Sequence, residues 1–295
     1  MSNLKPATDQ AFRLAEGPVW DAVRNRLLWV DILDGVVMQG VLDADGRIQA
    51  GPMWRSRDMI GAVAVADDGR IVVAARETIA VLRPDGSMMD GPRVIPAGAR
   101  RRLNDGAIDP GGRFVVGTLS LDKPSMGETL VRWEDDGSLT VIDGDLTLSN
   151  GVAWSADGRV MYNVDTMRGV VFTREYDPVS GAAGQRHVHL RLDGGHPDGI
   201  AVDAEDHLWI AMWGAGEVRR FSPHGSPIGR LRLPAPHSSS VAFAGPDLRT
   251  LIVTTARAEL TAEQLRAAPD SGRLFSARVD VPGLPVPAWS RPSTL

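Results

Sequence analysis

The sequence contains six copies of one hairpin motif, and successive copies start 45, 43, 46, 48 and 41 residues apart. The clearest copy is LSNGVAWSADGRVMYNVDT, from Leu148 to Thr166, in which two apolar runs flank an Asp-Gly turn. This pattern is a strong signal for an antiparallel β-hairpin. A period of this size is typical of propeller blades. The corresponding opening residues of the six copies are Glu16, Gly61, Asn104, Asn150, Asp198 and Ser239.

A second pair of apolar runs around a turn follows each copy, as in TIAVLRPDGSM. Each repeat is therefore predicted to be a four-stranded meander, and six such sheets bury their apolar faces by stacking around an axis. We expect an all-β protein, a six-bladed β-propeller of four-stranded antiparallel blades. No Pro/Gly/Ser linker interrupts the repeat, so residues 1–295 are predicted to form a single domain with short extensions at both ends.

Composition narrows the possible partners. The chain carries 32 Lys and Arg against 37 Asp and Glu, a net charge of −5, which is unsuited to nucleic acid or an anionic membrane. The absence of cysteine excludes disulfides and thiolate nucleophiles. Neither a signal peptide nor an apolar run of transmembrane length is present, so we expect a cytoplasmic protein. A closed propeller needs no partner subunit, so a monomer is expected.

Five of the six inner strands open on a polar side chain. The first strand of a propeller blade is the innermost, so the opening residues are expected to converge at one end of the central channel. Four of them carry carboxylate or amide oxygens: Glu16, Asn104, Asn150 and Asp198. Carboxylates gathered inside an apolar wall require a compensating cation or protons. The alternative interpretation is that these residues merely begin strands, as polar residues often do.

The oxygen-only donor set favours one divalent metal ion. Calcium, magnesium or manganese suits such ligands, and zinc or iron is possible; the residue types do not choose among them. The second strand of each blade ends on the same face, so loops on that face should surround the mouth with Asp31, Arg102, Asp122, Asp165, Trp213 and Arg257. Such a polar cup suits a small hydroxylated ligand.

Nucleophilic catalysis by serine is a weaker alternative. Ser149 and Ser238 to Ser240 lie near the predicted mouth, and His196 and His237 flank inner strands. The sequence contains no G-x-S-x-G nucleophile elbow.

Three structural details are also expected. Tryptophans 20, 29, 133, 154 and 209 should fill the gaps between blades. The good helix formers from Ala258 to Ala268 predict a short helix in the last loop, which is either a partial lid or filler. The ring could be closed by an outer strand from residues 7 to 13 or by the tail GLPVPAW.

The combined motifs resemble the SMP-30/gluconolactonase/luciferin-regenerating-enzyme family, which includes regucalcin-like proteins and sugar lactonases. The matching segments span nearly the whole chain: LAEGPVW, RLNDGAIDPGGRFVVGT, LSNGVAWSADGRVMYNVDT, PDGIAVDAEDHLWIAMWG and TTAR. The resemblance implies a six-bladed propeller.

The resemblance also implies roles for individual residues. Glu16, Asn150 and Asp198 correspond to the metal ligands of the family. Asn104 corresponds to a residue that contacts the substrate and the water on the metal, and Arg102 to a substrate-binding arginine. Relatives often use an acidic residue in the loop that reads SLDKPSMGE here, for which Asp122 is the nearest match.

The expected function is metal-dependent hydrolysis of a sugar (aldono-)lactone to its aldonic acid. Asp198 would both bind the metal and accept a proton from the attacking water, while Arg102 and Asn104 orient the lactone. Two alternatives stay open, because a fold does not fix chemistry. One is another metal-dependent esterase or phosphotriesterase, and the other is a non-enzymatic calcium-binding propeller.

Overall fold

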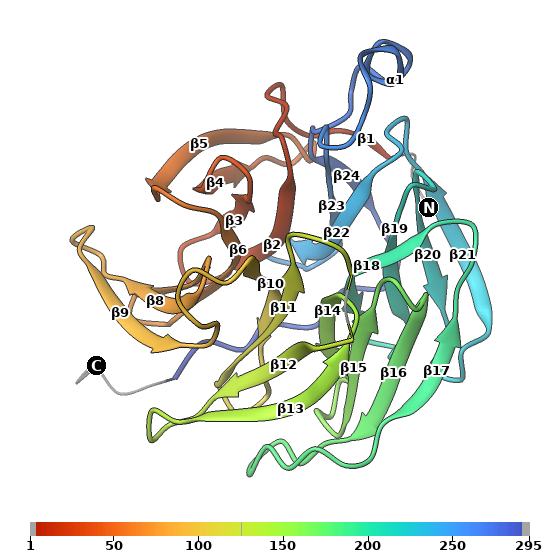
Figure 1. The fold of residues 1–295 in the computed structure, drawn as a ribbon. Helices are drawn as coiled ribbons and strands as arrows, with labels where there is room; N and C mark the ends of the chain where they lie inside the picture. The colour runs from red at the N-terminus through yellow and green to blue at the C-terminus, as the bar shows by residue number, and fades with distance from the viewer. Residues whose placement is uncertain (1–3, 125, 291–295) are drawn as a thin grey trace.

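Six four-stranded antiparallel sheets surround a central axis (Figure 1). The structure, a computed structural model, describes residues 4–124 and 126–290, and these contain one short helix among 24 strands. The predicted six-bladed all-β propeller is confirmed. The ends of the predicted domain, residues 1–3 and 291–295, lie outside the described residues.

The first three blades follow the chain from the inner strand outward. Blade 1 contains β2 (Ala15–Asp21), β3 (Arg26–Asp31), β4 (Val36–Leu42) and β5 (Ile48–Arg55). Blade 2 contains β6 (Ile60–Val65), β7 (Ile71–Ala75), β8 (Thr78–Leu82) and β9 (Met88–Arg93). Blade 3 contains β10 (Arg101–Ile108), β11 (Phe114–Ser120), β12 (Glu128–Trp133) and β13 (Leu139–Leu146).

The next two blades repeat this order, and the last departs from it. Blade 4 contains β14 (Ser149–Trp154), β15 (Val160–Asp165), β16 (Val170–Glu175) and β17 (His187–Arg191). Blade 5 contains β18 (His196–Val202), β19 (Leu208–Trp213), β20 (Glu217–Phe221) and β21 (Pro227–Arg232). Blade 6 contains β22 (Ser238–Ala244), β23 (Thr250–Thr255), β24 (Phe275–Arg278) and β1 (Lys5–Pro6).

One turn geometry joins the two inner strands of the repeats. In blade 4 the Gly158 amide donates to the Ser155 carbonyl over 2.8 Å, with Gly158 at φ +71°. The equivalent last turn residue in blade 5 is Asp206, and in blade 6 it is Leu248, at φ +59° and +51°. The turn thus requires a left-handed residue, which glycine supplies without strain.

The hydrophobic core lies between adjacent blades. One cluster joins blades 2 and 3, where Val72 and Ile79 pack with Leu103 and Phe114. The five tryptophans that were predicted to fill such gaps are all buried: Trp20, Trp29, Trp133, Trp154 and Trp209. This stacking fixes the inner strands around the axis.

The N-terminus closes the ring. Lys5 pairs with Ser276 and Pro6 with Phe275, so β1 forms the outer strand of blade 6. Of the two predicted alternatives, closure by an N-terminal outer strand is confirmed, although the strand is Lys5–Pro6 and not residues 7–13; closure by the tail GLPVPAW was wrong. The tail instead crosses the opposite end of the channel, where its trace passes behind the blades in Figure 1. It is anchored there by the Trp289 amide, which donates to the Val65 carbonyl over 2.8 Å.

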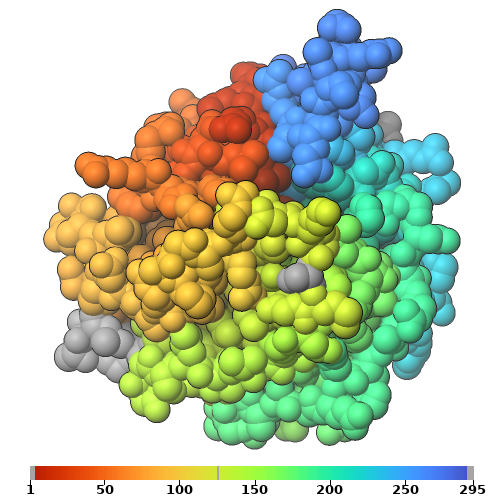
Figure 2. Space-filling model, in the orientation of Figure 1, coloured from red at the N-terminus to blue at the C-terminus, as the bar shows by residue number. Residues whose placement is uncertain are grey.

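The predicted helix is present but shorter than expected. Helix α1 (Ala262–Ala267) begins at Thr261, whose side chain and that of Gln264 form a capping box. None of its residues is buried, and it stands out from the rim in Figure 2. No helix in residues 4–124 and 126–290 is both long and apolar enough to cross a membrane.

Candidate active site

A register shift occurs in every inner strand at its opening residue. In blade 1 it falls between Glu16 and Val19, and in blade 4 between Ser149 and Val152. The other four inner strands shift at the equivalent place. Such bulges redirect side chains and are frequent beside functional sites. The bulge therefore explains how side chains from separate blades come to line one space.

Close approach of neighbouring inner strands shapes this level of the channel. A Cβ on Gly151 would lie 2.6 Å from the carbonyl oxygen of Asp198, so this position permits only glycine. Blades 4 and 5 thus meet without an intervening side chain beside Asn150 and Asp198. The two predicted ligands are brought near each other by this contact.

A chain of hydrogen bonds connects blades 3, 4 and 5 at the floor of the site. Arg102 Nη1 donates to Asn104 Oδ1 over 2.6 Å, and Asn104 Nδ2 donates to Asn150 Oδ1 over 2.9 Å. Asn150 Nδ2 donates to Thr166 Oγ1 over 3.0 Å, and Thr166 Oγ1 donates to the carbonyl of Pro197 over 2.9 Å. Both asparagine side chains are buried and held in one orientation.

Two carboxylates complete the floor, and both are buried. Burial and repulsion from Asp105 raise the pKa of Glu16 to about 8. Burial, followed by repulsion from Glu16 and Asp105, raises the pKa of Asp198. Arg102 opposes both shifts, and burial lowers its own pKa to about 10. One guanidinium thus opposes the pKa shifts of two carboxylates without cancelling either, so each carboxylate favours a proton or a further cation.

The donor set fits a divalent cation. Asp198 Oδ1 is buried and has no hydrogen-bond partner among the described residues. The Glu16 carboxylate accepts a hydrogen bond from the Gly17 amide over 3.1 Å. Within residues 4–124 and 126–290, no three Asp, Glu or His side chains form a metal-binding group. A metal here would therefore need an amide oxygen, such as that of Asn150, beside the two carboxylates, and hard cations accept such oxygens.

These residues form the floor of a cavity of about 790 Å3. Its lining contains every residue of the predicted site: Glu16, Arg102, Asn104, Asp122, Asn150 and Asp198. Gly61 and Ser239, the other two opening residues, do not line it. Ser239 instead donates to the carbonyl of Ala15 over 2.6 Å and so joins blade 6 to blade 1.

The rim differs in part from the prediction. Trp213 and Arg257 line the cavity, and Trp213 stacks on His237 with ring centroids 4.1 Å apart. Asp122 lines it too, but its carboxylate is paired with Arg100 at 2.5 Å. Helix α1 does not line the cavity; of the last loop, only residues 257–259, before the helix, do so.

Asp31 and Asp165 were wrongly expected at the mouth. The Asp31 carboxylate accepts from the backbone amides of Arg13 and Leu14 over 3.0 and 3.1 Å. The Asp165 carboxylate accepts from the amide and hydroxyl of Thr147. Each therefore ties the end of the second strand to the loop that enters the first strand of its own blade.

A serine nucleophile finds no support in the geometry. Ser238 Oγ donates to the carbonyls of Met212 and Glu217, and Ser149 Oγ has no partner among the described residues. His196 lines the cavity. No hydrogen bond joins a serine to a histidine in the described part of the chain.

Two residues of this region were not identified from the sequence. Thr166 bridges Asn150 to the residue before Asp198. The equivalent residue of blade 1 is Ile32, which has no hydroxyl. Asp105 is the second. The equivalent residues of the other copies are all small, Gly17, Ala62, Gly151, Gly199 and Ser240. A single carboxylate among small residues at one repeat position was the available signal.

Comparisons with known proteins identify the family of this chain. The family described as SMP-30/Gluconolactonase/LRE-like region matches residues 14–257. A 6-deoxy-6-sulfogluconolactonase from Pseudomonas putida is 35% identical over 292 residues, covering 97% of this chain and 98% of the relative. A pentonolactonase from Haloferax volcanii is 33% identical, covering 84% of this chain and 83% of the relative.

A solved structure shows the same architecture. It is that of regucalcin from Agrobacterium tumefaciens, described as a calcium-binding protein, which superposes with a TM-score of 0.91 at 27% identity. The match covers 98% of this chain and 97% of that chain. Family match, relatives and fold agree with the resemblance found in the sequence: this chain belongs to the SMP-30/gluconolactonase/LRE-like family, which includes hydrolases of sugar lactones.

Proposed function

We propose that this protein hydrolyses a sugar (aldono-)lactone to the corresponding aldonic acid, with water activated beside a divalent metal ion in the central channel. The observation that carries the proposal is the orphaned, buried Asp198 oxygen at the floor of a polar cavity, beside a second buried carboxylate. The names of the two lactonase relatives support the reaction type. The calcium-binding description of the regucalcin structure supports a divalent ion.

Glu16, Asn150 and Asp198 would hold the ion, which is calcium, magnesium, manganese, zinc or iron. The chemistry that such an ion supplies when bound is Lewis-acid polarisation of a carbonyl. The raised pKa values of Glu16 and Asp198 favour this assignment, because buried carboxylates that repel each other are stabilised by a cation.

The remaining steps belong to side chains of the cavity. Arg102 and Asn104 bind the ring oxygen or hydroxyls of the lactone by charge-assisted and amide hydrogen bonds. Asp122, at the mouth, contacts a sugar hydroxyl. Asp198 accepts a proton from water as the water oxygen bonds to the carbonyl carbon. The bond from that carbon to the ring oxygen then breaks, and Asp198 returns the proton to the leaving oxygen, which gives the aldonic acid.

A lactone panel tests the proposal. The protein is treated with a chelator, dialysed, and supplied separately with each of the five metals. Hydrolysis of glucono-, galactono-, xylono-, arabinono-, fucono- and 6-deoxy-6-sulfogluconolactone is followed by release of acid. We expect turnover of at least one lactone that is lost on chelation and restored by metal.

Asp198→Asn tests the role of the carboxylate. General base catalysis contributes about 10²–10⁴-fold, so turnover should fall by at least that much while the melting temperature stays near that of the parent. Asp193→Asn is the matched control, because Asp193 is exposed in the loop that enters the same strand. A parent protein that hydrolyses no lactone with any metal, yet is stabilised by calcium, would support the non-enzymatic alternative. Hydrolysis confined to other esters or to phosphotriesters would support the alternative of a metal-dependent esterase or phosphotriesterase.

Two further properties are part of this proposal. The protein is expected to act as a monomer, since the six blades close into a ring through β1 and β24 without a second chain. It is expected in the cytoplasm. Its partner is the small-molecule lactone, with no nucleic acid and no membrane involved.

A further inference from the structure

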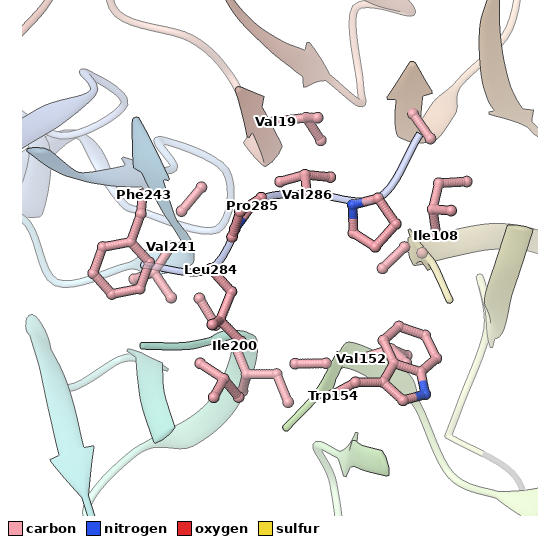
Figure 3. Close-up of a pocket in the computed structure, with 18 of the residues that line it drawn as sticks. Val19, Ile108, Val152, Trp154, Ile200, Val241, Phe243, Leu284, Pro285 and Val286 are labelled. Atoms are coloured by element: carbon pink, nitrogen blue, oxygen red, sulfur yellow. The ribbon is translucent and has the colours of Figure 1, made fainter. Parts of the chain in front are cut away.

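A second cavity occupies the opposite end of the central channel. Its volume is about 390 Å3, within the range of about 300–1,000 Å3 common for small-molecule sites. Apolar side chains from several blades face its open centre, as Figure 3 shows for Val19, Ile108, Val152, Ile200 and Val241.

The C-terminal tail forms one wall of this cavity. Leu284, Pro285 and Val286 run across it in Figure 3, after Gly283 has paired with Asp203. Beyond the cavity the tail is fixed by Trp289, which is buried and stacks on Trp133. The wall is thus part of the folded structure, and the cavity is bounded on this side by the chain itself.

One carboxylate lies among the apolar groups. Asp105 lines this cavity and not the one that contains Asp198. Its only hydrogen bond among the described residues is from the Gly106 amide to Oδ1, over 2.9 Å. Arg102, the cation nearest to it in sequence, instead donates to the carbonyl of Leu103 and to Asn104 Oδ1. No ion pair among the described residues includes Asp105, and the residue is half-buried where it lines the cavity.

We propose that this cavity is a second binding site, separate from the lactone site, for a small apolar molecule that carries one primary ammonium group. The apolar part would contact Val19, Ile200 and Val241, and the ammonium would pair with Asp105. Charge complementarity selects this class. An anion would be repelled by the carboxylate, whereas a neutral apolar molecule would leave it unpaired.

Benzylamine is the probe for this site, and benzyl alcohol is its neutral counterpart of similar shape. Calorimetric titration of the purified full chain should give one benzylamine site. Benzyl alcohol should bind at least about tenfold more weakly, because it lacks the charge-assisted hydrogen bond. Saturating gluconate, a product of the proposed reaction, should leave benzylamine binding unchanged, since the two cavities have no lining residue in common.

Two variants locate the probe. Val19→Phe fills the cavity from a half-buried position and should abolish benzylamine binding without loss of lactone turnover. Asp105→Asn should weaken benzylamine by about tenfold and leave benzyl alcohol unaffected. The proposal is overturned if benzylamine does not bind, if gluconate displaces it, if the alcohol binds equally well, or if Val19→Phe retains full affinity. The benzylamine and benzyl alcohol titrations of the parent and of both variants do not depend on whether the protein is a lactonase, whereas the gluconate competition and the turnover of Val19→Phe do.

Discussion

The amide nitrogen of Asn104 donates a hydrogen bond to the amide oxygen of Asn150 over 2.9 Å, although the two residues belong to neighbouring blades. Asn150 is also held from its other side, because its amide nitrogen donates to Thr166 Oγ1. The orientation of the Asn150 oxygen, a proposed metal ligand, is therefore set by Thr166. The same hydroxyl reaches the carbonyl of Pro197, directly before Asp198.

Thr166→Val should loosen two of the proposed ligands at once. Valine keeps the shape of threonine but removes the hydroxyl, so Asn150 loses its acceptor and Pro197 its donor. Residues that orient metal ligands typically contribute about 10–100-fold to metal affinity or activity, and we expect a loss of metal affinity of that size. Calorimetric metal titration measures it without turnover. Thr166→Ser, which keeps the hydroxyl, should restore most of the affinity; equal affinity in valine and serine variants would contradict the positioning role.

The pH dependence of stability should differ between metal-free and metal-loaded protein. The pKa of Glu16 is raised from 4.5 to about 8, so the folded metal-free protein binds this proton more tightly than the unfolded chain does. Stability of the metal-free protein should then fall as pH rises from about 4.5 to about 8. A divalent ion that takes the place of the proton should stabilise increasingly over the same window.

Melting temperatures recorded with chelator and with metal between pH 5 and about 8 test this expectation. Glu16→Gln removes the titrating group, so the metal-free variant should show a flatter profile than the parent. A chelated parent protein that becomes more stable as the pH rises through this window would show that Glu16 does not bind its proton more tightly on folding.

The architecture could be predicted from sequence because each blade is specified locally. An Asp-Gly or equivalent turn and two apolar runs recur with the repeat, and the turn geometry of Gly158 is shared by Asp206 and Leu248. The residues at the floor of the site could be predicted from the same alignment of the repeats. One strand position carries Glu16 and Asp198, and a bulge there directs both into one cavity.

Other features depend on contacts between distant segments, which no local pattern specifies. Ring closure rests on two residues, Lys5 and Pro6, that pair with a strand near the far end of the chain. Strand direction correctly predicted that Asp31 and Asp165 lie on the face of the propeller that contains the site. It did not predict where their side chains point. Backbone amides of an adjacent loop turn each carboxylate away from the cavity. The tail crossing likewise depends on tertiary packing around Trp289.

Arg102→Lys should weaken lactone binding although it keeps the positive charge. The arginine Nη1 donates to Asn104 Oδ1 and to the carbonyl of Leu103, which leaves the rest of the guanidinium fork to face the cavity. Lysine is a point charge and cannot hold Asn104 and a substrate oxygen in the same geometry. We expect KM to rise about tenfold or more, with a smaller change in kcat. Steady-state kinetics measure this split.

Arg57→Lys is the matched control, because Arg57 is exposed in a loop on the same face and does not line the cavity. Its kinetics should equal those of the parent. An unchanged KM in Arg102→Lys would mean that Arg102 supports the fold of the site without touching substrate.

Trp289→Ala should separate stability from catalysis. Trp289 is buried, stacks on Trp133 with ring centroids 5.5 Å apart, and lies under the Arg70 guanidinium. Truncation of a buried tryptophan costs about 3–5 kcal/mol, so urea unfolding should show a loss of that order. Val286→Ala, at a tail position that is 44% exposed, should lose far less free energy of unfolding. The tail lines only the cavity opposite Asp198, so kcat/KM for lactone should stay near the parent value at temperatures below the melting transition. A loss of kcat/KM in the folded variant would mean that the two ends of the channel are coupled.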